Sequence, residues 1–193
     1  MRLKGKKIGF AITGSHCTFE KTFPQVEKLK KEGADVHVIF SEAALNTDTR
    51  FGKAQDWYNK FLEASGNPII TTIAEAEPIG PKNYLDCIVV APCTGNTLGK
   101  LANAITDSVV TMAVKAQLRN SKPVVIAIST NDGLGNNAKN IGILLNSKNI
   151  YFVPFKQDNP QEKPNSLVAN MDLLLDTILA ALEGKQLQPI LDR

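Results

Sequence analysis

The chain of 193 residues lacks most features that identify a protein class at once. It has three cysteines, Cys17, Cys87 and Cys93, and this odd number without C-x-x-C spacing argues against a disulfide framework and against a structural zinc site. The net charge is only +3, with no basic stripe for nucleic acid. Its apolar runs are too short to cross a bilayer. We therefore expect a cytoplasmic protein with no metal, no nucleic acid and no membrane contact.

Two nucleotide-binding motifs are also missing. Gly9, Gly14 and Ser15 faintly resemble a phosphate loop, but His16 and Cys17 stand where the Lys-Ser/Thr pair is required. The same stretch, "TGSHCTFE", has one glycine and thus no G-x-G-x-x-G dinucleotide fingerprint. What remains is a short strand-to-helix turn with a glycine, a hydroxyl and exposed amides. Such a turn suits a single phosphate at a helix N-terminus, although a plain helix start would need the same residues.

What the chain does have is an alternation of apolar runs with helical patterns. The length predicts one domain over residues 1–193. The nearly continuous runs are typical of parallel strands covered on both faces. They are Lys7 to Thr13, Asp35 to Phe40, Leu85 to Ala91, Pro123 to Ser129 and Ile150 to Phe155. The order predicts an α/β, doubly wound three-layer sandwich with a mainly parallel sheet, flavodoxin-like or Rossmann-like.

Helical spacing appears between the strands. One helix is expected to end at Gly33, with Thr22 and Gln25 as a capping box, and another lies around Trp57. Further helices follow in "SVVTMAVKAQLRN" and "NIGILLNSKN". The most strongly amphipathic pattern, residues 166–184, predicts a long helix near the end of the chain.

The ligand crevice of such a sheet lies beyond the carboxyl ends of its strands. The segments there are "TGSHC", "SEAAL", "PCTGNT" and "STNDGLGNN". In the third, Pro92 is expected to stop the strand, and Thr94, Asn96 and Thr97 supply hydrogen-bond donors and acceptors. Gly95 would let backbone approach a flat or anionic ligand. This pattern predicts a binding loop, whereas a turn capping the next helix would need only one of these residues.

The stretch "APCTGNTLGKLANAITDS" resembles the P-A-S-A-N-T signature of the homo-oligomeric flavin-containing cysteine decarboxylase family. The likeness continues through "KPVVIAIS" and "NNAKNIGILLNSKNIYFVPF", and "IGFAITGSHC" resembles the opening strand and flavin phosphate turn of that family. Together these segments cover most of the chain. The resemblance implies an FMN-binding flavoprotein that forms trimer-based homo-oligomers.

The resemblance also assigns cofactor-binding residues. It places Gly14 and Ser15 at the phosphate turn and Ser41 after the second strand, and it places the signature loop around the flavin. The cofactor-binding residues of that loop are Pro92, Thr94, Asn96 and Thr97. Within the family the chain most resembles a branch of sporulating bacteria that acts on a small dicarboxylate with a dehydrogenase-like partner subunit. Oxidation of a dihydropyridine dicarboxylate to the aromatic pyridine is the implied reaction.

Two family features are absent. The family's substrate-clamping motif, P-x-M-N-x-x-M-W, corresponds here to "STNDGLGNNAKN", and the family histidine after the second strand has no counterpart in residues 41–62. A non-catalytic stabilising or regulatory subunit with a vestigial pocket is therefore an alternative, and a stand-alone flavin-dependent decarboxylase is another. His16 and Asn96 are the candidates for catalysis, whereas His37 fits a packed strand position. Candidates for holding the dicarboxylate, by position, are Lys100, Asn131 and Arg119.

Overall fold

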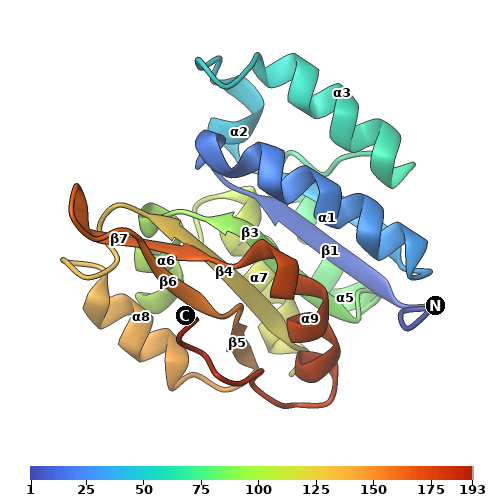
Figure 1. Ribbon diagram of the computed structural model, residues 1–193. Helices are drawn as coiled ribbons and strands as arrows, with labels where there is room; N and C mark the ends of the chain where they lie inside the picture. The colour runs from blue at the N-terminus through green and yellow to red at the C-terminus, as the bar shows by residue number, and fades with distance from the viewer. Residues whose placement is uncertain (193) are drawn as a thin grey trace.

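A computed structural model describes residues 1–192 and contains one seven-stranded sheet. The strands run in the order β2-β1-β3-β4-β7-β6, and β5 pairs with β4 (Figure 1). The parallel strands are β1 (Lys7–Ile12), β2 (Asp35–Phe40), β3 (Cys87–Cys93), β4 (Val124–Thr130) and β5 (Ile150–Phe152). The strands β6 (Phe155–Asn159) and β7 (Lys163–Ala169) are antiparallel additions beside β4. The mainly parallel sheet of the prediction is confirmed.

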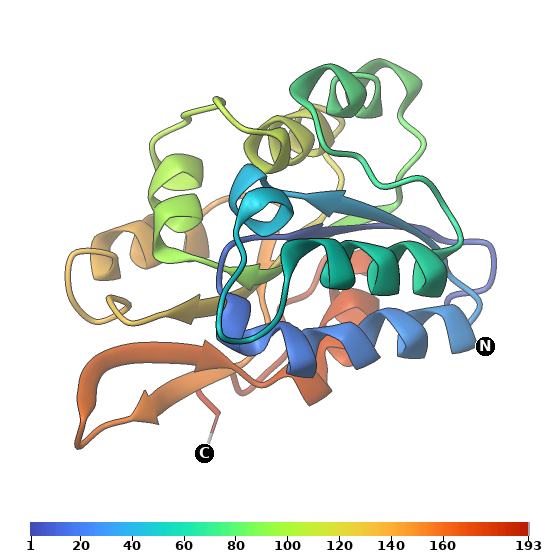
Figure 2. The ribbon, with the colours of Figure 1, turned by 90° about the horizontal axis from the view of Figure 1, so that it is seen from above.

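Helices cover both faces of this sheet, which confirms the three layers. Figure 2 shows α1 (Phe19–Lys31) and α9 (Leu174–Leu182) on one side, and α7 (Val109–Arg119) on the other. Packed near α7 are α4 (Ile73–Ala76), α5 (Ile79–Lys82) and α6 (Gly95–Ala102), and α8 (Ala138–Leu145) lies against α6. The remaining helical elements are η1 (His16–Thr18), α2 (Glu42–Asn46), α3 (Ala54–Ser65) and η2 (Met171–Leu173). Within residues 1–192, no helix is long and apolar enough to cross a membrane.

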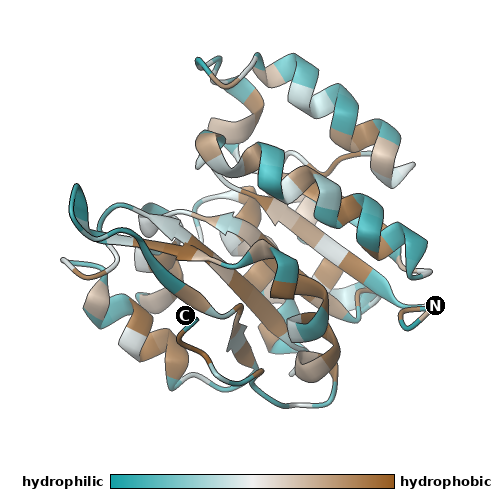
Figure 3. Ribbon diagram, viewed as in Figure 1, coloured by the Kyte–Doolittle hydropathy of each residue, from teal (hydrophilic) through white to brown (hydrophobic). Residues whose placement is uncertain are grey.

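The apolar core lies along the central strands, which are largely in the hydrophobic colour in Figure 3. The strand β3 is buried at every position. A strand that is covered on both faces has no polar side to present, so its sequence is apolar throughout. The aromatic side chains of Phe40 and Phe61 meet edge to face and pack α3 against β2. The core therefore holds the carboxyl ends of the parallel strands at one edge of the sheet.

The long helix predicted for residues 166–184 is wrong in its first part. Ser166 to Ala169 belong to β7, which pairs with both β4 and β6. Asn170 then caps η2 by accepting a hydrogen bond from the Asp172 N–H at 3.1 Å, and only α9 continues the predicted helix. The apolar spacing of residues 166–171 fits a helix and a half-buried strand equally well, and pairing with the sheet decides between them.

Two local predictions also fail. Pro92 does not stop its strand, because β3 continues to Cys93 across a register shift between Val90 and Cys93. Thr22 does not cap α1, because its hydroxyl lies inside the helix and donates to the Thr18 carbonyl at 3.0 Å. Gly33, by contrast, does have the left-handed backbone expected after a helix end, with φ of 89°.

Candidate functional site

A cleft of about 440 Å³ lies at the carboxyl ends of β1, β2 and β3. Its lining combines hydroxyl, amide and charged side chains with a few small residues. The lining residues are Thr13, Gly14, Ser41, Glu42, Ala43, Thr94, Asn96, Thr97, Lys100, Asp107, Ser108 and Val110. The cleft therefore brings together segments separated by almost a hundred residues of sequence.

Three helices begin at this cleft. Their N-cap residues, Ser41 of α2, Thr94 of α6 and Ser108 of α7, all line it. Each cap hydroxyl accepts a hydrogen bond of 3.2 Å from a backbone N–H in the first turn of its helix. The N-terminal end of a helix carries partial positive charge and free N–H groups, so three such ends around one cleft favour an anionic ligand.

The hydroxyl of Thr13 joins two walls of the cleft. It donates to the Pro92 carbonyl at 2.6 Å and accepts from the Thr94 N–H at 3.0 Å. Thr13 is buried, so these bonds are shielded from water. The end of β1 and the signature loop after β3 are therefore fixed relative to each other.

One ion pair closes the side of the cleft formed by α6 and α7. The Lys100 ammonium lies 2.7 Å from the Asp107 carboxylate, and both residues line the cleft. Lys100 is the cation of the lining, and Glu42 supplies a second carboxylate. An anion that enters the cleft would compete with Asp107 for the Lys100 ammonium.

Most of the cofactor-binding residues expected from the sequence lie together in this cleft. Five of them line it, namely Gly14, Ser41, Thr94, Asn96 and Thr97. Pro92 is buried within β3 and reaches the site through its carbonyl alone. Ser15 does not line the cleft; its hydroxyl is 2.7 Å from that of Ser129 and 3.2 Å from that of Thr18. Thus Pro92 and Ser15 lie beside the lining, and their role in cofactor binding stays a prediction.

Gly95 has a different place from the one expected. A Cβ on this residue would lie 2.6 Å from both the Thr130 hydroxyl and the Asn137 side-chain nitrogen. The missing side chain therefore makes room for the loop after β4, rather than for a ligand in the cleft.

His16 does not line the cleft either. Its ring lies 5.0 Å from that of Phe19, and its Nε2 atom is buried with no hydrogen-bond partner in the part of the chain that the structure describes. Of the two catalytic candidates, Asn96 alone lies in the cleft. Cys17 is exposed nearby, whereas Cys93 is buried, and this burial raises the pKa of the Cys93 thiol. These positions agree with cysteines that line or support the site.

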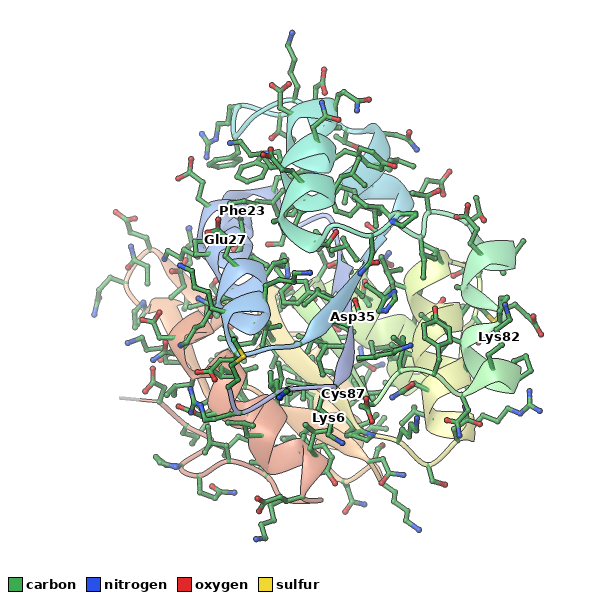
Figure 4. The ribbon with its side chains drawn as sticks, turned by 90° about the vertical axis from the view of Figure 1, so that its right-hand side faces the viewer. Lys6, Phe23, Glu27, Asp35, Lys82 and Cys87 are labelled. Atoms are coloured by element: carbon green, nitrogen blue, oxygen red, sulfur yellow. The ribbon has the colours of Figure 1, made fainter. Side chains whose placement is uncertain are left out.

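His37 belongs to the opposite edge of the sheet, onto which Figure 4 looks, with Asp35 labelled at the start of β2. The His37 ring is 3.1 Å from the Asp35 carboxylate and meets the Tyr84 ring edge to face. Burial disfavours the charge of Asp35, yet hydrogen bonds from Asn67 and His37 lower the pKa of Asp35 overall. His37 is thus a packed, hydrogen-bonded strand residue.

The three candidates for holding a dicarboxylate separate in the structure. Lys100 lines the cleft, but Asn131 faces β7, where its side-chain oxygen accepts from the Ser166 hydroxyl at 3.3 Å. Arg119 ends α7, roughly 14 Å along that helix from Val110 at the 1.5 Å rise per residue of an α-helix. Only Lys100 is in place for this role.

Sequence reasoning missed several lining residues, above all Asp107 and Ser108. Their signal was present, because Ser108 and Thr111 form a reciprocal cap at the start of α7. Glu42 and Ala43 follow directly from Ser41 at the start of α2. Thr13 belongs to no recognisable motif. Its role depends on the pairing of β1 with β3, which the sequence alone does not give.

Comparison with known proteins agrees with this α/β architecture and its carboxyl-edge cleft. The Flavoprotein family model matches residues 1–182, and the chain belongs to this family. It is 56% identical over 189 residues to the B subunit of dipicolinate synthase from Bacillus subtilis, covering 98% of this chain and 94% of that protein.

Two solved structures extend the comparison. The crystal structure of the dipicolinate synthase B subunit from Bacillus halodurans C has a TM-score of 0.92 and 53% identity, covering 100% of this chain and 99% of that one. DmrB of Burkholderia xenovorans, solved in complex with FMN, has a TM-score of 0.66 and 16% identity, covering 90% and 93% of the two chains. At that identity DmrB shows a shared fold alone.

Proposed function

We propose that this chain is the flavoprotein-like B subunit of a dipicolinate synthase and that it binds FMN in the cleft at the carboxyl edge of its sheet. The near full-length similarity to the B subunits of two Bacillus dipicolinate synthases supports the assignment of the reaction. The observation that carries the assignment of the site is the convergence of three capped helix N-termini, at Ser41, Thr94 and Ser108, on one cleft.

The residues of the cleft fit FMN. The turn at Gly14, which the resemblance assigns to the phosphate, lines the cleft, and the hydroxyls of Thr94 and Thr97 with the amide of Asn96 suit the donors and acceptors at the edge of a flavin ring. Gly14 approaches α2 so closely that a Cβ there would lie 3.0 Å from the Cβ of Ala43, which leaves bare backbone at this wall. These are the properties that a nucleotide-like ligand with a flat ring requires.

The reaction fits the same site. Conversion of a dihydrodipicolinate-type precursor to pyridine-2,6-dicarboxylate removes two electrons and two protons from the ring. FMN, when bound, supplies an acceptor for the two electrons. The chain's own part is to hold the dianionic substrate, for which the Lys100 ammonium and the helix N-termini supply positive charge. Asn96 lines the cleft, and we assign its amide to orienting the ring.

A second candidate function is a stabilising or regulatory subunit with a weakened pocket. It is favoured by the lining of the cleft, which contains no histidine among residues 1–192 to move a proton, and His16 itself is not part of that lining. In that case the chemistry would belong to the dehydrogenase-like A subunit of the synthase. We propose this A subunit as the partner of the chain in either case, in trimer-based homo-oligomers within a sporulating bacterium.

The visible absorption spectrum of the purified chain separates these functions. The spectrum is recorded alone, after addition of FMN, and after addition of the A subunit and the dihydropyridine substrate. The first function predicts a flavin band that bleaches when substrate is supplied without oxygen. The second predicts no flavin uptake and full turnover by the A subunit. Turnover of a cysteine-containing substrate by the chain alone would contradict both.

A further inference from the structure

The loop that follows β4, residues 131–137, packs against α6, the helix that begins in the signature loop. The side-chain nitrogen of Asn137 and the hydroxyl of Thr130 occupy the space where a side chain at Gly95 would lie. Gly95 stands between Thr94 and Asn96, which line the cleft on the other side of α6. Whatever fixes Asn137 therefore also limits where the signature loop can lie.

Asp132 fixes Asn137. One carboxylate oxygen of Asp132 accepts from the Asn137 side-chain nitrogen at 3.2 Å, and the other accepts from the Asn136 N–H at 2.9 Å. The main-chain carbonyl of Asp132 also accepts from the N–H groups of Gly135 and Asn137, at 3.3 Å each. One residue thus holds both the backbone of this loop and the Asn137 side chain that faces Gly95.

The charge of Asp132 also decides which way the neighbouring amides point. An ionised carboxylate only accepts hydrogen bonds, so Asn137 must turn its nitrogen toward Asp132 and its oxygen away. That oxygen accepts from the side-chain nitrogen of Asn140 at 2.9 Å. The oxygen of Asn140 is then left buried without a partner among residues 1–192, in a residue only 7% exposed. If the amides of Asn137 and Asn140 both point their nitrogen toward Asp132, the oxygen of Asn140 has no donor left to bond. The unpaired oxygen of Asn140 agrees with this orientation.

We propose that Asp132 is a positioning residue for the cofactor cleft, acting through the oriented amide of Asn137 on the place of Gly95. Residues 131–137 lie in the segment "STNDGLGNNAKN", which corresponds to the family's substrate-clamping motif but differs from it. In this proposal they serve as a fixed support for the signature loop. Asp132 itself does not line the cleft. The proposal rests on the proposed function wherever FMN binding is used to measure the effect.

The test compares Asp132→Asn with a double variant that exchanges the two groups, Asp132→Asn with Asn137→Asp. In the single variant an amide faces an amide, so one bond of the series is lost or reversed. In the double variant the amide introduced at position 132 donates to the carboxylate introduced at position 137, which still accepts from Asn140. The matched control is Asp158→Asn, which makes the same change of charge on the exposed β6 strand.

For Asp132→Asn we expect weaker FMN binding, with a dissociation constant at least tenfold larger than that of the native chain. The flavin absorption maximum should also change. The exchanged variant should return to within about threefold of the native constant, and Asp158→Asn should match the native chain. Native affinity in Asp132→Asn would overturn the proposal. So would a loss that the exchange does not restore, because that would indicate a merely structural role.

A second readout does not need FMN. Hydrogen exchange of the Thr97 and Leu98 amides reports on the start of α6, because these N–H groups are held by the side chain and carbonyl of Thr94. This exchange should be at least tenfold faster in Asp132→Asn than in the native chain. In the exchanged variant it should match the rate of the native chain. A native chain that takes up no FMN would contradict the proposed function alone, whereas unchanged exchange in Asp132→Asn would contradict the positioning role alone.

Discussion

The loops after β3 and β4 have similar composition and opposite uses. Both are rich in hydroxyl, amide and glycine residues, and both follow buried parallel strands. After β3, the side chains of Thr94, Asn96 and Thr97 line the cleft. After β4, Asp132 and Asn137 bond to each other instead. Composition thus marks a polar loop, but only the direction of its side chains separates a binding surface from a support.

The largest contrast is expected between two thiols near this edge. Cys93, at the end of β3, is buried and its pKa is raised by burial, whereas Cys17, in the turn after β1, is exposed. Because the thiolate is the reactive form, Cys17 should react with an aromatic disulfide reagent at least a hundredfold faster than Cys93 near pH 8. A Cys17→Ser variant should lose this fast phase, and a fast phase that persists would show that the β3 end opens to solvent.

The burial of Cys93 also makes the stability of the fold depend on pH. An unfolded cysteine has a pKa of about 8.5, whereas burial raises the pKa of the folded Cys93 thiol, which stays neutral there. The stability due to this thiol is therefore fully present below about pH 8.5 and is lost as pH rises above that value. Urea unfolding midpoints measured at several pH values from neutral to moderately alkaline would check this sign.

Next in size is the packing between the two loops. Gly95→Ala should destabilise the fold by roughly 1–3 kcal/mol, because the new Cβ would press on Thr130 and Asn137. Gly142→Ala is the matched control, since a Cβ there meets nothing within 4 Å and the change should stabilise α8 by up to about 1 kcal/mol. Urea unfolding gives both values. Equal effects at the two glycines would contradict the close contact behind α6.

The two loops should also differ in their response to charge. Asn96→Asp is expected to weaken FMN binding about tenfold, which is about 1.4 kcal/mol, by placing a negative charge and one fewer donor in the cleft. Asn131→Asp adds the same charge to the loop after β4 and should leave the affinity unchanged. Fluorescence titration measures both. An equal loss in the two variants would mean that overall charge, and not the lining of the cleft, controls binding.

The smallest effect is expected at His16. Its ring packs on Phe19, and its buried Nε2 has no partner within residues 1–192, so His16→Ala removes no hydrogen bond at that atom. Folding should remain intact, with a change in unfolding free energy of less than about 1 kcal/mol. A thermal melt tests this. A large fall in the midpoint would give His16 a structural role.

The sequence predicts the parallel strands and the cleft edge well, because both depend on local patterns. Continuous apolar runs mark β1 to β4, and glycine and hydroxyl residues mark the turns that follow. Five expected residues accordingly line the cleft together. Family resemblance added the cofactor, which local patterns do not specify.

The Thr22 cap failed for a local reason, but other differences between expectation and structure come from pairing between distant segments. The strand β7 resembles a helix start until β4 and β6 pair with it. Ser15 suits a phosphate turn by its sequence, and only the fold shows that its hydroxyl lies 2.7 Å from that of Ser129. Gly95 suggests close approach of a ligand until Asn137 takes the adjoining space. In each case the deciding partner belongs to another strand or to a loop far along the chain.

The hairpin of β6 and β7 offers a practical handle on the molecule. It projects from the edge of the sheet in Figures 1 and 2, and its tip, residues 160–165, is exposed throughout. The tip lines no part of the cleft. Several of its hydrogen bonds join residues close in the sequence, such as the 3.0 Å bond from the Asn159 side-chain nitrogen to the Glu162 carboxylate. A fluorophore attached at Gln161 would therefore label the chain while leaving the cleft and its support intact.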